Sequence, residues 1–139
     1  MPLLNALAIA GSGMAAESQR LTAVASNIAN ANSVSTSSGT AYRAREVVFQ
    51  AVSADDDNDT PSGAGAAGVR VAAVVESAAP LRTSYDPGSP FADPNGYVTM
   101  PNVNSVEEMV NMISAQQDYQ ANLEAFNVAK SLALRTLTI

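Results

Sequence analysis

Apolar residues recur every three or four positions near both ends of this chain, and no other feature of the sequence constrains the fold as strongly. This spacing places apolar side chains along one face of a helix. It predicts one helix within residues 1–32 and a second within residues 105–139, which pair as a coiled coil. Gly11 and Gly13 each weaken the first helix by roughly 1 kcal/mol relative to alanine, which allows a bend there. Ser105, followed three residues later by Glu108, predicts a capping box at the start of the second helix.

The segment between the helices, residues 33–104, changes to a pattern that is typical of β-strands. Residues 47–52, 69–75 and 97–100 form strand-length runs that are rich in β-branched side chains. The third run follows the turn signal Asn95-Gly96. An acidic and glycine-rich stretch, residues 53–68, predicts a flexible loop between the first two runs. The sequence therefore predicts a mainly α fold with a small central antiparallel β module.

The composition limits both the core and the chemistry of the chain. With 26 alanines and only 5% aromatic residues, the hydrophobic side chains are mostly small, so any core is thin. The absence of His and Cys removes the imidazole base, the thiolate nucleophile and the ordinary zinc site. We therefore expect no catalytic residues, no cofactor and no bound metal, and we do not expect an enzyme.

The charge and hydropathy patterns exclude further classes of partner. A formal net charge of −6 makes the chain a poor partner for nucleic acid, because phosphate backbones require clustered Lys and Arg. We expect no transmembrane segment, since no apolar run approaches about 18 residues. We also expect no cleaved signal peptide, because the first basic residue is Arg20 and the positively charged start of such a peptide is missing.

Two motifs in the predicted loop have a simpler interpretation than ligand binding. Residues 63–68 formally match the glycine fingerprint of dinucleotide-binding folds, but they precede a predicted strand and not a helix, which favours a flexible linker. Asp55, Asp57 and Asp59 have the spacing that begins an EF-hand loop, but the required glycine and final glutamate are missing.

The two helical stripes predict assembly. Helices so rich in Ala, Asn and Gln would be marginally stable as a lone antiparallel pair, and they gain most by packing against other copies or partner helices. We therefore expect the larger apolar residues of the stripes to form an assembly interface. These residues are Leu3, Leu7, Met14, Leu21, Val24, Ile28, Val106, Met109, Val110, Met112, Ile113, Tyr119, Leu123, Phe126, Leu134 and Leu137.

Particular motifs give the chain a resemblance to a known family. Residues 25–33 (ASNIANANS) and 38–43 resemble the Asn-rich signature near the N-terminus of bacterial flagellar rod and hook proteins. Residues 93–98 (DPNGYV), 100–104 (MPNVN), 106–113 (VEEMVNMI) and 119–122 (YQAN) resemble the C-terminal part of the same family. The motif residues that carry the resemblance are Asn27, Asn30, Tyr42, Asn95, Gly96, Tyr97, Pro101, Asn102, Gln120 and Asn122.

The resemblance implies a structural component of the proximal rod of the flagellar basal body, located in the periplasmic space. It implies self-assembly through the terminal helices, torque transmission, and contacts with copies of the chain and with other rod proteins. It also implies export through the flagellar type III apparatus without a cleaved signal. The alternative is a small secreted binding module that recognises a partner through its β part.

Overall fold

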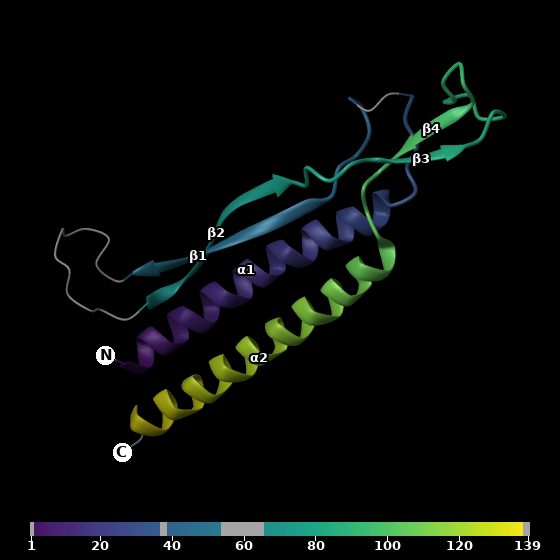
Figure 1. Ribbon diagram of the computed structural model, residues 1–139. Coiled ribbons are helices and arrows are strands. Elements are labelled where there is room, and N and C mark those ends of the chain that lie inside the picture. Colours follow the sequence, from purple (N-terminus) through teal and green to yellow (C-terminus); the bar gives the residue numbers. More distant parts are fainter. Residues whose placement is uncertain (1, 37–38, 54–65, 138–139) are drawn as a thin grey trace. The chain divides into compact units, whose positions relative to one another are not determined.

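The structure is a computed structural model that describes residues 2–36, 39–53 and 66–137 (Figure 1). Its elements in chain order are α1 (Pro2–Asn30), β1 (Arg45–Ser53), β2 (Ala66–Glu76), β3 (Arg82–Tyr85), β4 (Tyr97–Met100) and α2 (Ser105–Leu137). β1 pairs with β2 in one two-stranded sheet, and β3 pairs with β4 in another. Two long terminal helices that pack together, with a small antiparallel β module between them in the sequence, confirm the predicted fold class.

The contacts divide the chain into two compact units. The first unit contains the described parts of residues 1–21, 47–73 and 113–139, and the second contains those of residues 22–46 and 74–112. Each unit therefore includes a stretch of both terminal helices together with strand residues.

In the first unit, α1 and α2 approach each other through small side chains. Ala10 and Ala16 of α1 and Ala115 and Ala129 of α2 are all buried. The helices run antiparallel, since the start of α1 lies beside the end of α2 (Figure 1). Small residues on both facing surfaces allow this close packing, but they bury little apolar area each.

α1 is continuous through Gly11 and Gly13, where the sequence allows a bend. The helix runs without interruption from Pro2 to Asn30, through Gly11 and Gly13. A Cβ atom added at Gly13 would lie 2.9 Å from Nδ2 of Asn122 on α2, whereas a Cβ at Gly11 would meet nothing within 4 Å. Gly13 therefore allows α1 and α2 to approach closely, although glycine has a lower helix propensity than alanine.

The β1–β2 sheet is tied to α1 in the first unit through Ser12. The backbone N–H of Val69 donates to Ser12 Oγ at 3.0 Å, and Ser12 Oγ donates to the carbonyl oxygen of Ile9 at 2.8 Å. A Cβ at Gly68 would lie 2.6 Å from Ser12 Oγ, so only glycine permits this contact between strand and helix.

The second unit is built around β3 and β4. The two strands pair antiparallel, with Arg82 opposite Met100 and Tyr85 opposite Tyr97. Beside this sheet, a small cluster of buried apolar residues forms the core of the unit, with Tyr42 packed against it. The buried members of the cluster are Ala31, Ala44 and Val103.

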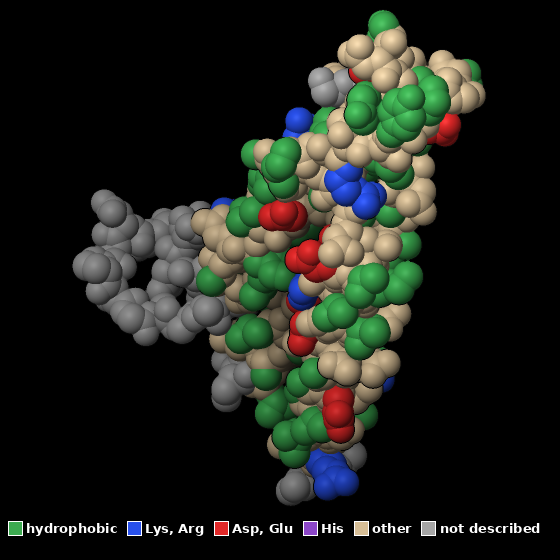
Figure 2. Space-filling model, turned by 45° about the vertical axis from the view of Figure 1, so that its right-hand side comes forward, with side chains coloured by type: hydrophobic (Ala, Val, Ile, Leu, Met, Phe, Trp, Pro, Cys, Tyr) green, Lys and Arg blue, Asp and Glu red, His purple; other side chains and the backbone are tan. Residues whose placement is uncertain are grey.

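The predicted thin core is confirmed. Apart from Pro101, the buried apolar side chains within residues 2–36, 39–53 and 66–137 belong to alanines and valines. Many larger apolar side chains are exposed instead, among them Leu4, Val110 and Val128. The small side chains fit the close helix packing, and many of the large ones lie on the surface (Figure 2).

The structure differs from the sequence-based expectations at two local features. β3 was not predicted, because its four residues are polar or aromatic, all exposed, and show no alternation. The helix cap was placed one residue too late: Asn104 Oδ1 accepts from the N–H of Val106 at 3.2 Å, and the Glu108 carboxylate is engaged by Asn27 instead of closing a capping box. The two loop motifs at residues 55–59 and 63–68, apart from the end of the second, lie outside the described residues.

Candidate assembly surfaces

Asn27 is the polar centre of the second unit. This residue in the last turns of α1 is 1% exposed, and its side-chain amide makes four hydrogen bonds. Nδ2 donates to the carbonyl oxygen of Arg45 at 2.9 Å and to Glu108 Oε2 at 3.0 Å. Oδ1 accepts from the Tyr42 hydroxyl and from the Arg45 N–H, both at 2.9 Å. Because an amide has two donor hydrogens and two acceptor lone pairs, every hydrogen-bonding position of Asn27 is filled.

Tyr42 links this network to the small core. Burial raises the pKa of Tyr42 above its ordinary value of 10.0, the Arg45 charge lowers it, and the Glu108 and Glu76 charges raise it. The Arg45 guanidinium carbon lies 5.7 Å from the centre of the Tyr42 ring. Tyr42 therefore stays neutral and acts as a hydrogen-bond donor to Asn27.

Asn102 makes a second set of bridging hydrogen bonds. Its Oδ1 accepts from the Ala44 N–H at 2.8 Å, and its Nδ2 donates to the carbonyl oxygens of Ser77 at 3.2 Å and Ala79 at 3.0 Å. Arg43 donates to the same two carbonyl oxygens at 3.1 and 3.3 Å. One asparagine thus joins three chain segments of the second unit that are distant in sequence.

A tight turn ends the second sheet at its tip. Asp93 Oδ1 accepts from the N–H groups of Asn95 at 2.8 Å and Tyr97 at 2.9 Å. Gly96 has a positive φ of 85°, and a Cβ there would lie 2.9 Å from the Tyr85 ring. Glycine is required at this position for both reasons. The rings of Tyr85 and Tyr97 meet edge to face, with centroids 5.3 Å apart, and both side chains remain exposed.

The other motif residues have simpler places. Asn30 Nδ2 donates to the Ser26 carbonyl oxygen at 2.8 Å within α1, and Pro101 is fully buried. Gln120 is exposed on α2, whereas the half-buried Asn122 lies against Gly13. Most of the motif therefore stabilises the turns and junctions of the subunit, and its residues are not gathered into one pocket.

The expected assembly residues fall into two groups in the structure. One group is buried or half-buried within the fold and consists of Leu3, Leu7, Met14, Leu21, Val24, Ile28, Met112, Tyr119 and Phe126. The other group is exposed and consists of Val106, Met109, Val110, Ile113, Leu123, Leu134 and Leu137. The exposed group lies entirely on α2 and offers apolar surface to a partner.

The first turns of α2 carry three of these exposed apolar side chains. Val106, Met109 and Val110 are 68%, 53% and 61% exposed, and their spacing of three and four places them on one side of the helix. Glu107 adds a negative charge beside them in the first turn, where the helix dipole favours it. We call Val106, Met109 and Val110 the α2 ridge.

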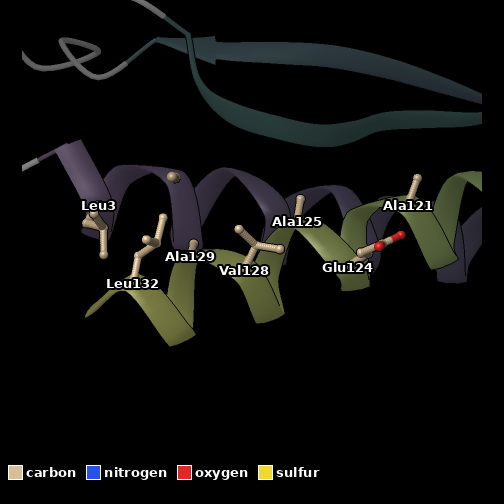
Figure 3. A pocket seen from close by; sticks show the side chains of 8 residues that line it. Leu3, Ala121, Glu124, Ala125, Val128, Ala129 and Leu132 are labelled. Atoms are coloured by element: carbon tan, nitrogen blue, oxygen red, sulfur yellow. The ribbon is translucent and has the colours of Figure 1, made fainter. Parts of the chain in front are cut away.

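An open groove of about 630 Å³ lies in the first unit between the start of α1 and the second half of α2 (Figure 3). Its lining is apolar except for Glu124, and half of it is alanine. The lining residues are Leu3, Ala6, Ala121, Glu124, Ala125, Val128, Ala129 and Leu132. Alanines hollow this surface, while Leu3, Val128 and Leu132 provide larger apolar walls.

The sequence reasoning missed the groove. Ala121, Ala125, Val128 and Leu132 follow the helical spacing of four, three and four, which is a recognisable signal. The signal was overlooked because the stripe chosen on α2 followed the larger side chains, such as Leu123. Leu4 and Ile9, exposed on α1, were missed for the same reason.

Neither a metal-binding cluster nor a membrane-spanning helix is found among the described residues. Within residues 2–36, 39–53 and 66–137, no group of three or more acidic, His or Cys side chains is placed to hold a metal ion. In the same ranges, neither helix is long and apolar enough to cross a membrane.

Comparison with known families defines the class of the chain. A family model described as "Flagella basal body rod protein" matches residues 7–35, in α1 and the segment after it. Another, described as "Flagellar basal body rod FlgEFG protein C-terminal", matches residues 95–139, which contain β4 and α2. Flagellar rod family models thus match residues of both terminal helices.

Individual relatives narrow this class. The flagellar basal-body rod protein FlgC of Salmonella typhimurium is 52% identical over 139 residues, covering 100% of this chain and 98% of the relative. FlgC of Escherichia coli O6:H1 is 53% identical with the same coverage, and FlgC of Borreliella burgdorferi is 36% identical over 152 residues, again with the same coverage. The chain belongs to the FlgC family of flagellar basal-body rod proteins, and its role is structural.

Proposed function

We propose that the chain is a subunit of the proximal rod that polymerises through the exposed faces of its terminal helices. The observation that supports this most directly is the exposure of large apolar side chains on α2 above a core of alanine and valine. A subunit of this kind leaves apolar area uncovered until neighbours bury it, at about 25 cal/mol per Å².

The groove and the α2 ridge are suited to each other on neighbouring copies. The groove is hollowed by alanines, and the ridge consists of Val106, Met109 and Val110, which are larger. Glu124 lines the groove, and both Glu124 and Arg135 line a hollow that adjoins it, so the match with the ridge rests on apolar shape and not on charge. A contact between two different patches of the same chain is heterologous, and it generates an open helical polymer when successive rotations do not close into a ring.

The thin core also suits passage through the flagellar type III export apparatus. An ordered residue costs about 1–2 kcal/mol of backbone entropy, and a core of small side chains offsets this cost only weakly. The subunit therefore unfolds readily for export and is stabilised when other rod proteins cover its helices. In the finished rod it transmits torque as a structural element without catalysis.

Replacement of Val128 by aspartate tests this function in cells that carry only the variant. Val128→Asp places a charge in the groove and is expected to leave secretion intact while preventing completion of the rod. Thr83→Asp adds the same charge to the exposed strand β3 and should leave rod assembly unchanged. Basal bodies are counted by electron microscopy, and normal rods in the Val128→Asp strain would refute the proposed use of the groove.

A further inference from the structure

Glu17 is a buried carboxylate in the otherwise apolar packing surface of α1. The residue is only 9% exposed, and its Oε2 atom has no hydrogen-bond partner among the described residues. A carboxylate that is removed from water without hydrogen bonds is disfavoured in its charged form. Ionisation of Glu17 therefore opposes the packing of the helices in the first unit.

The charge that faces Glu17 is shared with a second carboxylate. Arg20 Nη1 lies 3.5 Å from Glu17 Oε2 on the same helix and 3.5 Å from Asp118 Oδ2 on α2. The Glu17 side chain is 11% exposed, that of Arg20 28% and that of Asp118 53%. One guanidinium nitrogen thus compensates two carboxylates, of which only Asp118 is well solvated.

Arg20 and Asp118 are the charged groups that act on Glu17. Burial raises the pKa of Glu17 above its ordinary value of 4.5, Arg20 lowers it, and Asp118 raises it further. Burial and the second carboxylate outweigh the single arginine. The folded chain therefore holds a proton on Glu17 more tightly than the unfolded chain does.

We propose that Glu17 is a proton-dependent switch for the pairing of α1 with α2 in the first unit. When Glu17 is protonated, its burial is no longer opposed, and Arg20 is left to Asp118 alone as an ion pair between the two helices. When Glu17 ionises, the helix pair contains a buried carboxylate that must share Arg20 with Asp118, and the pair opens more easily.

The raised pKa of Glu17 sets the direction in which pH changes the stability of the helix pair. The stabilisation is fully present below about pH 4.5, the ordinary value, and it is lost as the pH rises through the higher value of the folded chain. The helix pair is thus tightest in mild acid and loosest near neutral pH. This switch lies in the packing of the subunit and is independent of the groove and the ridge.

Urea unfolding of the full chain between pH 4 and pH 8 tests the switch, with Glu17→Gln as the variant that mimics the protonated side chain. The wild-type urea midpoint should match that of Glu17→Gln at pH 4 and fall below it at pH 7. Glu46→Gln, on the exposed surface of β1, should follow the wild type at both pH values. A difference between wild type and Glu17→Gln that is the same at both pH values would overturn the proposal.

A carboxyl ¹³C NMR titration of the wild-type chain gives a second answer without the Glu17 variant. The midpoint of Glu17 should lie above the ordinary value of 4.5, and Asp118→Asn should lower the Glu17 midpoint by releasing Arg20 to it. A Glu17 midpoint at the ordinary value, or no response to Asp118→Asn, would contradict the switch.

Discussion

Removal of the Asn27 side chain should destabilise the subunit far more than removal of any other motif asparagine in α1. Asn27→Ala deletes four hydrogen bonds at 2.9–3.0 Å from a residue that is 1% exposed. Each net hydrogen bond contributes about 0.5–1.5 kcal/mol, and a partner left buried without one costs more. Tyr42 and Glu108 are half-buried and can regain some hydration, so we expect a loss of about 3 kcal/mol.

The matched control is Asn30→Ala, one turn further along α1. Asn30 makes one hydrogen bond, to the Ser26 carbonyl oxygen of its own helix, and alanine has the higher helix propensity. Its replacement should change the unfolding free energy by less than about 1 kcal/mol. With a urea dependence of about 2 kcal/mol per M, Asn27→Ala should lower the midpoint by about 1.5 M, measured by circular dichroism.

A charge variant identifies the contact between Asn27 and Glu108. Asn27→Asp removes two donors and places a second carboxylate beside Glu108, and the added change Glu108→Gln supplies a donor in return. The double variant should therefore be more stable than Asn27→Asp alone. The reasoning fails if Asn27→Ala and Asn30→Ala are equally damaging, or if Glu108→Gln brings no recovery in the Asn27→Asp background.

Two further comparisons address the packing of the helices. Gly11→Ala should raise the unfolding free energy by roughly 1 kcal/mol, whereas Gly13→Ala should raise it less because the Asn122 amide must move. Equal increases for the two variants in thermal unfolding would contradict the close contact between Gly13 of α1 and Asn122 of α2. Phe126→Ala should destabilise the isolated chain by about 2–4 kcal/mol, because Phe126 packs within the fold. Leu123→Ala, at a 40% exposed position, should leave the stability of the chain nearly unchanged but reduce the number of completed rods. Urea unfolding measures the first effect and counts of basal bodies the second, and a reversed order of the two variants would show that the inner face of α2 is wrongly assigned.

The secondary structure was largely predictable because it depends on local pattern. The recurrence of apolar residues every three or four positions predicted both helices, and runs of β-branched residues predicted β1, β2 and β4. β3 was not predictable from its own four residues, since its strand conformation follows from pairing with β4. The same limit applies to Asn104, whose capping role depends on where the helix begins.

The orientation of the stripe on α2 was harder to predict than its existence. Apolar side chains occur on more than one face of this helix, and sequence reasoning favours burial of the larger ones. The structure buries Ala115 and Ala129 instead, because Gly13 and other small residues let the helices come close. Ile113 and Leu134 are exposed as a result. Which of the expected residues contact neighbouring subunits stays a prediction.

The motif asparagines show a similar limit. The resemblance marked Asn27, Asn30 and Asn102 together, but their hydrogen bonds differ in number and reach. Asn27 and Asn102 join segments that are distant in sequence, whereas Asn30 bonds within its own helix. Only the folded arrangement reveals this difference, because each partner is a backbone or side-chain group whose position depends on the rest of the unit.

The accessibility of one introduced thiol tests the central claim that neighbouring subunits cover the groove. The chain contains no cysteine, so Val128→Cys creates its single reactive thiol, and Thr83→Cys on β3 provides the control. Maleimide labelling is compared between the dilute chain and isolated basal bodies. We predict that Val128→Cys is labelled at least about ten times more slowly in the basal body, while the rate for Thr83→Cys changes much less. Equal labelling rates of Val128→Cys in both states would contradict the account.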